Sequence, residues 1–301
     1  MERESLFKDR SFSSVIANAY RAQTDYIGKI LKASWLPALL TGVCYATMLI
    51  LLLPDEAHPI PSLTSGIVAL LCAVAGLFFF TWAFSRVMSL LNERPRRWNL
   101  KRTIIMTLNL IVIYIVLAMV VTGLLILLIK VMGKDPIHIL FDKMWVLPLF
   151  VLCLTLLILP FYYITMRYMD QPDVRFWKDL WGGYKRGLRY FGFIFLTLFV
   201  CQIIMALLMT LVMMPFVILM MAHSASFWGT MLGDAPDMPG YFPILLWATA
   251  VAVHFVAFEI YTYVIIVTYL TYGSIEKQEA DRRERLLIIH NTDHERENPI
   301  H

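Results

Sequence analysis

Residues 191–222, FGFIFLTLFVCQIIMALLMTLVMMPFVILMMA, contain no Asp, Glu, Lys or Arg. About 20 consecutive apolar residues are enough to cross the ~30 Å hydrocarbon core of a bilayer as a helix. Because lipid cannot hydrogen-bond the backbone, such a run must be helical. This run is long enough to tilt or kink, and Pro215 lies near its outer end. The stretch therefore predicts a membrane-spanning helix.

Five further apolar runs follow the same pattern: Trp35–Leu53, Gly66–Leu91, Ile104–Met132, Met144–Met169 and Tyr241–Tyr272. The 301 residues are 59% hydrophobic and only 16% charged, whereas a soluble domain is about half apolar and a quarter charged. The sequence therefore predicts an all-α polytopic membrane protein with six transmembrane helices. No cleavage pattern follows the first run, so we expect that run to be retained as a span rather than removed as a signal peptide.

Lys and Arg are concentrated on alternate connections between the runs. All but three of the 26 lie in the N-terminal segment, the second and fourth connections and the C-terminal tail; the three exceptions are Lys130, Lys134 and Lys143. The positive-inside rule then predicts that both termini are cytoplasmic. We expect a cytoplasmic amphipathic segment (1–34), a six-helix membrane domain (35–273) and a charged cytoplasmic tail (274–301). The first half of that tail should be helical, and the part beyond Asn291 disordered.

Two stretches on the predicted cytoplasmic side, Ser11–Trp35 and Val174–Phe191, place apolar residues at three- and four-residue spacing opposite basic ones. Basic amphipathic helices with aromatic faces lie in the membrane interface. Contacts to anionic lipid headgroups or to a partner are therefore predicted in the second stretch and in the connection between the second and third runs. The residues concerned are Lys178, Lys185, Arg186, Arg189, Arg96 and Arg97.

The two stretches also resemble each other. NAYRAQTDYIG and GGYKRGLRYFG align at one offset, which pairs Tyr20 with Tyr184 and Gly28 with Gly192. This favours three hairpin repeats that begin and end in the cytoplasm. The alternative is that aromatic and basic residues gather at the interface in any membrane protein.

The sixth run carries a carboxylate, Glu259, whose insertion at mid-span costs ~2.5–3.5 kcal/mol and which should therefore face protein or water. Thr262 and Tyr263 share its helix face, and depth along the helices selects Gln202 as its partner. We expect a Glu259–Gln202 hydrogen bond, with Glu259 protonated by desolvation. A polar clasp between helices is favoured over an ion or proton site. His254 faces another direction and is interpreted as a structural histidine.

Several classes of site are not indicated. The cysteines (Cys44, Cys72, Cys153 and Cys201) all fall inside predicted spans and suggest neither disulfide nor metal. The outer-loop histidines (His58, His138 and His223) match no ligand spacing, so no metal or cofactor is predicted. The sequence contains no Gly-rich phosphate loop, HExxH or GxSxG, so no enzymatic activity is predicted. No separate soluble domain exists that would bind nucleic acid.

The junction RFWKDLWGGYKRGLRYFG, residues 175–192, follows four of the six spans, and an amphipathic segment precedes the first. In this pattern the chain resembles a group of bacterial envelope proteins. The group includes the six-span membrane domain fused to some glycerophosphodiester phosphodiesterases, together with stand-alone relatives. The resemblance covers nearly the whole chain but rests on no diagnostic motif. The phosphodiesterase domain is absent, so the resemblance implies only a bacterial inner-membrane protein of poorly defined role.

Together these features predict a non-enzymatic, multi-pass inner-membrane protein. We expect a role in envelope or membrane homeostasis through binding of membrane lipids, of a membrane-protein partner or of a second copy of the chain. The alternative is a proton- or ion-coupled transporter or channel that uses Glu259.

Overall fold

The computed structural model describes residues 7–54, 62–131, 146–233 and 238–297. Within these ranges the regular elements are all helices: α2 (Phe12–Leu52), α3 (Leu63–Leu91), α4 (Arg96–Val131), α6 (Val146–Ile158), α7 (Phe161–Asp170), α8 (Phe176–Arg189), α9 (Phe191–Met231) and α10 (Phe242–Glu297). In this part of the chain six helical stretches are long and apolar enough to cross a membrane. The prediction of a multi-pass, all-α membrane protein is confirmed.

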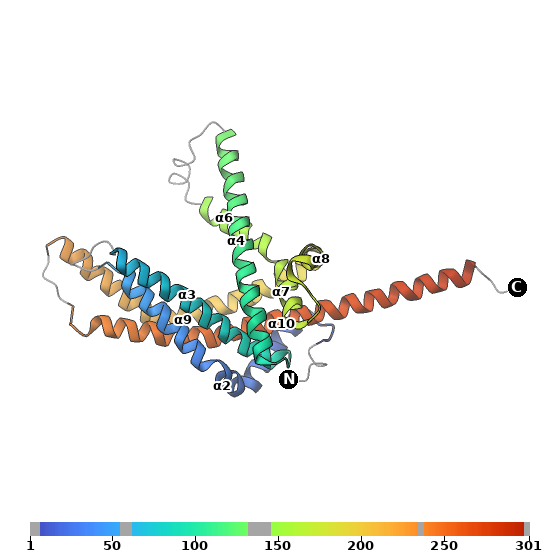
Figure 1. Cartoon of the computed structure of the whole chain (residues 1–301), viewed down its shortest axis with the longest axis horizontal. Helices are drawn as coiled ribbons and strands as arrows, with labels where there is room; N and C mark the ends of the chain where they lie inside the picture. The colour runs from blue at the N-terminus through green and yellow to red at the C-terminus, as the bar shows by residue number, and fades with distance from the viewer. Residues whose placement is uncertain (1–6, 55–61, 132–145, 234–237, 298–301) are drawn as a thin grey trace. The chain divides into compact units, whose positions relative to one another are not determined.

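Several helices run beyond the predicted spans (Figure 1). The N-terminal amphipathic stretch and the first span form one helix, α2. α10 likewise passes through Gly273 and continues to Glu297. The prediction of disorder beyond Asn291 is therefore wrong for residues 292–297. Tyr272 and Ser274 are buried on either side of the glycine, and tertiary packing of this kind overrides the tendency of glycine to end a helix. The predicted boundaries at residues 34 and 273 therefore fall inside continuous helices.

The chain divides into two compact units. The second unit, residues 14–103 and 198–267, contains most of α2, with α3, most of α9 and the first half of α10. Its core is built from small residues. One cluster joins Ala38, Ala83 and Phe258, and another joins Ala46, Ala250 and Val251. Small side chains let the backbones of membrane helices approach closely.

Gly42 marks a close approach of α2 to α10. A Cβ atom placed on it would lie 2.9 Å from the Val251 carbonyl oxygen. Ala46, one helical turn further along, lies in the cluster with Ala250 and Val251, so small residues at four-residue spacing pack α2 against α10.

The first unit comprises residues 1–13, 104–197 and 268–301. Here the predicted fourth span, Met144–Met169, is broken at Pro160 into α6 and α7. Proline lacks the backbone N–H that would continue the helix, and its ring clashes with the preceding turn. Residues 171–175 then connect α7 to α8, and these two helices pack together.

The α7–α8 contact is made through glycines. Cβ atoms placed on Gly183 and Gly187 would lie 2.7 Å from Ile164 Cβ and 2.8 Å from Pro160 Cα, respectively. α8 therefore rests directly on the Ile164 side chain of α7 and on the backbone of Pro160, in the turn before that helix.

The structure treats the two aligned sequence segments differently. NAYRAQTDYIG lies inside α2, whereas GGYKRGLRYFG crosses from α8 into α9. The repeat of three hairpins therefore stays a prediction.

Candidate functional site

The amphipathic helix α8 has a buried face, an exposed apolar face and a basic edge. The buried face consists of Phe176, Gly183 and Gly187. A second face carries Trp177 and Trp181, which are 56% and 66% exposed, together with the exposed Leu188. At 100° per residue the lysines Lys178 and Lys185 lie beside this apolar face. We call these five residues the α8 surface: Trp177, Lys178, Trp181, Lys185 and Leu188.

The four basic residues predicted on α8 have different surroundings. Arg189 Nη1 lies 2.8 Å from Glu279 Oε1, and the side chains are 51% and 8% exposed, respectively. Arg186 donates to the Tyr163 hydroxyl at 3.4 Å, and this hydrogen bond raises the pKa of the Arg186 guanidinium. Lys178 and Lys185 are exposed, and the Lys185 ammonium lies 5.2 Å from the centre of the Trp181 ring. Two of the predicted headgroup contacts therefore hold α8 to its neighbours, and two remain at the surface.

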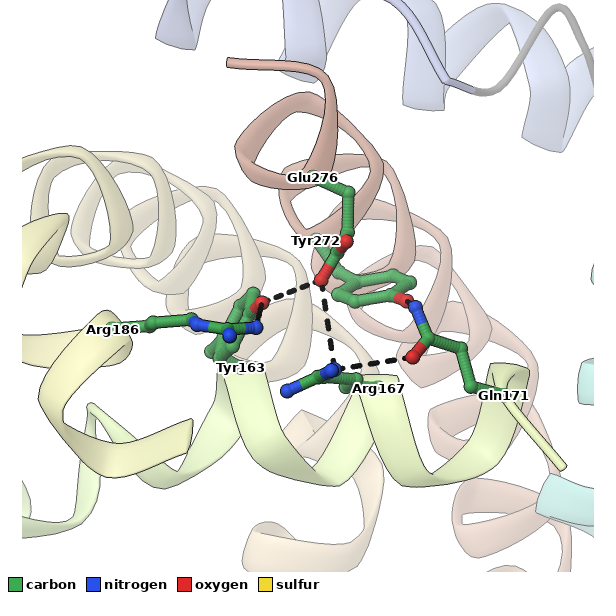
Figure 2. A network of polar contacts seen from close by, with 6 residues as sticks. All are labelled: Tyr163, Arg167, Gln171, Arg186, Tyr272 and Glu276. Carbon is green, nitrogen blue, oxygen red and sulfur yellow. Dashed lines mark hydrogen bonds and ion pairs between the residues drawn. The ribbon is translucent and has the colours of Figure 1, made fainter. Parts of the chain in front are cut away.

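Figure 2 shows the polar network that joins α7, α8 and α10 within this unit. Glu276 accepts a hydrogen bond from the Tyr163 hydroxyl, and Arg167 Nε lies 3.9 Å from the same carboxylate oxygen. Arg167 also donates to Gln171 at 3.2 Å. The amide of Gln171 in turn donates to the Tyr272 hydroxyl at 3.2 Å. The carboxylate of Glu276 is thus held by a phenol and a guanidinium from α7.

Sequence reasoning missed this network. Glu276 falls within the predicted charged tail, residues 274–301, and Arg167 is not among the predicted site residues. One signal was present, since Tyr272, Glu276 and Glu279 follow each other at four- and three-residue spacing and share a helix face. That face becomes visible only when the helix is extended beyond Gly273.

The predicted contacts Arg96 and Arg97 lie in the first turn of α4 and are exposed. The preceding turn is held by two buried amides: Asn92 donates to Asn99 at 2.8 Å, and Asn99 donates back at 3.0 Å. Glu93, inside this turn, has a φ of 56°. The assignment of Arg96 and Arg97 to lipid headgroups stays a prediction.

The partner predicted for Glu259 is wrong. Glu259 Oε1 lies at hydrogen-bonding distance from Ser34 Oγ of α2, at 2.9 Å, whereas Gln202 is exposed. The prediction counted depth from an expected helix end at Tyr272, but α10 continues beyond it, and the first half of α2 packs along α10. Glu259 therefore lies beside the part of α2 that also carries Lys29 and Lys32.

The other predicted members of this site lie nearby on α10. Thr262 donates to the carbonyl oxygen of Glu259 at 2.6 Å and accepts from the Gln23 amide at 2.8 Å. The Tyr263 hydroxyl donates to the Ile16 carbonyl at 3.3 Å. His254 Nδ1 lies 2.7 Å from the Ala250 carbonyl oxygen, so its ring has a local backbone partner.

In the described part of the chain no group of three or more His, Cys, Asp or Glu side chains is arranged to hold a metal ion. Of the outer-loop histidines, His223 lies 3.1 Å from the Pro54 carbonyl oxygen. His58 and His138 lie outside the described residues.

Comparisons with protein-family models, curated proteins and solved structures found no match. The α8 surface and the Glu259 site therefore carry the functional argument by their own geometry and chemistry.

Proposed function

We propose that this protein binds anionic lipids through the α8 surface, at the cytoplasmic face of a bacterial inner membrane. Its role in envelope or membrane homeostasis would then be non-enzymatic. One observation carries the proposal: α8 packs on α7 through glycines and leaves Trp177 and Trp181 exposed beside Lys178 and Lys185.

The chemistry of this surface matches a lipid headgroup layer. Tryptophan is enriched where hydrocarbon meets water, because its ring is apolar and its N–H is polar. Each lysine near an anionic membrane surface contributes roughly 1 kcal/mol of attraction. A lysine stem can also cover apolar surface while its ammonium stays in water. The Lys185 ammonium itself lies over the Trp181 ring, at the distance of a cation–π contact.

Further features support the location. The alternate distribution of Lys and Arg favours cytoplasmic termini, and α8 belongs to the same basic side. The resemblance to bacterial envelope proteins supports the inner membrane. A membrane-protein partner or a second copy of the chain is the competing occupant of the α8 surface.

Quenching of tryptophan fluorescence by brominated lipids tests the proposal. The full-length protein is reconstituted in vesicles that contain brominated phosphatidylglycerol or brominated phosphatidylcholine. The double variant Trp177→Phe/Trp181→Phe identifies the α8 fluorescence by difference. We expect stronger quenching of this component by phosphatidylglycerol, because lysines select anionic headgroups.

Matched charge variants separate the α8 surface from general charge. Lys178→Gln/Lys185→Gln should abolish the preference for phosphatidylglycerol. Arg283→Gln/Arg285→Gln, which removes two exposed charges from α10, should retain it. Equal quenching by both lipids in the wild type would contradict the proposal. Quenching by neither would show that protein covers this surface.

A further inference from the structure

Ser34 makes two short contacts with its single hydroxyl group. Its Oγ lies 2.8 Å from the Ile30 carbonyl oxygen and 2.9 Å from Glu259 Oε1. A serine hydroxyl carries one donor and two acceptor lone pairs, so its one proton would have to be shared between the two acceptors in a three-centre hydrogen bond. Both separations are instead ordinary distances for two-centre hydrogen bonds between oxygen atoms. The Ser34 side chain is fully buried, and the residue that it faces, Glu259, can supply the second proton.

We propose that Glu259 is a proton-binding site, in which the carboxylic acid donates to Ser34 Oγ and Ser34 donates to the Ile30 carbonyl. Serine commonly donates to the carbonyl four residues earlier in a helix. Under this assignment each of the two short contacts contains one proton. The proposal goes beyond lipid binding at α8, because it assigns a ligand, the proton, to a different part of the chain.

The residues that the structure describes around Glu259 hold its backbone in place but provide no cation for its carboxyl group. Its backbone carbonyl accepts from the Thr262 hydroxyl at 2.6 Å and from the Gln23 amide at 3.3 Å. Among the described residues, the hydrogen-bonding partner of its carboxyl group is Ser34 alone. An ionised carboxylate has about four lone-pair sites to satisfy, and a half-buried charge without a cation is costly. A neutral carboxylic acid needs fewer hydrogen-bond donors and no cation.

The helices packed around Glu259 carry their own titratable groups, whose contacts are with other residues. Lys29 of α2 lies over the Tyr26 ring, and Arg86 of α3 lies over the Trp82 ring. Other titratable groups on these helices include Arg21, Asp25 and Lys32 on the exposed face of α2, Cys201 of α9 beside Tyr263, and His254 on α10 itself.

A monovalent cation is the competing ligand, because the same oxygens could coordinate one. The short separations between them favour a proton, since oxygens that surround a metal ion are held apart by the ion itself. The experiment distinguishes the two ligands.

Infrared difference spectroscopy on the full-length protein in lipid gives the deciding measurement. The wild-type spectrum minus that of Glu259→Gln at neutral pH should contain the carbonyl band of a neutral carboxylic acid, shifted in heavy water. Gln keeps the shape and hydrogen-bonding reach of the side chain but cannot ionise. Carboxylate bands in place of the acid band would overturn the proposal.

Labelling of the wild type with dicyclohexylcarbodiimide provides a measurement that needs no variant. The acid proton passes to a carbodiimide nitrogen, and a carboxylate oxygen bonds to the central carbon. The adduct then rearranges to a stable N-acylurea, with no leaving group. We expect the label on the peptide that contains Glu259, falling as the pH is raised, and not on the exposed Glu284. Protection by sodium ions at constant pH would overturn the proposal in favour of a cation.

Discussion

The substitution Gly187→Ala tests whether backbone contact holds α8 on α7. A Cβ atom at this position would lie 2.8 Å from Pro160 Cα and 2.9 Å from the Pro160 carbonyl carbon, and still closer to the carbonyl oxygen. These are backbone atoms, so no side-chain rotation can relieve the contact. The turn between α6 and α7 would have to move, or α8 would have to lift away.

The expected magnitude follows from two opposing terms. Overpacking typically costs about 1–3 kcal/mol, and the upper end applies because several backbone atoms are involved. Replacing glycine by alanine inside a helix contributes about 1 kcal/mol in the opposite direction. The net destabilisation is therefore about 2 kcal/mol. At roughly 2–4 °C per kcal/mol for a protein of this size, the unfolding midpoint should fall by about 4–8 °C.

Gly182 supplies the matched control in the same helix. A Cβ atom there meets nothing within 4 Å, so Gly182→Ala should raise the midpoint by the propensity gain alone. Thermal unfolding of the wild type and both variants in one detergent makes the comparison. If Gly187→Ala unfolds at or above the wild-type midpoint, as Gly182→Ala should, then α8 does not rest on the Pro160 backbone and the reasoning fails.

Four further substitutions give outcomes that the same unfolding measurement can check. Arg189→Gln should cost about 1–3 kcal/mol, because it leaves the buried carboxylate of Glu279 without its cation. Glu279→Gln should cost less, since the arginine that it leaves behind is half-exposed to water. A larger loss of stability for Glu279→Gln than for Arg189→Gln would contradict this account of the ion pair. Glu93→Gly should stabilise by about 1 kcal/mol, because Glu93 has a left-handed φ of 56°; a lower midpoint would show that the Glu93 side chain compensates for this strain. Gly42→Ala should destabilise, because its Cβ would lie 2.9 Å from the Val251 carbonyl oxygen, and an unchanged midpoint would mean that α2 and α10 can separate at no cost.

The number and type of helices could be predicted because lipid restricts the backbone to one solution for a long apolar run. The ends of the helices could not. The amphipathic half of α2 and the charged end of α10 carry no hydropathy signal that distinguishes a continuing helix from a separate segment. Gly273 was a natural place to end the sixth span, yet its buried neighbours hold the helix through it.

The candidate sites, too, could be predicted from the sequence only in part. The exposed aromatic face of α8 was visible as a stripe in the sequence, but its packed face consists of glycines, which add nothing to such a pattern. For Glu259, depth along a helix says nothing about which neighbouring helix lies opposite. Ser34 was never a candidate, because it had been assigned to a segment outside the membrane.

The contact between Gly187 and Pro160 also makes α8 a reference for measuring depth in a membrane. With no side chain between Gly187 and Pro160, the height of Trp181 above α7 is set by backbone geometry, without the slack that rotamers would introduce. Depth measurements at three positions on the α7–α8 pair, Trp181 among them, would therefore fix the distance of each of its residues from the membrane surface.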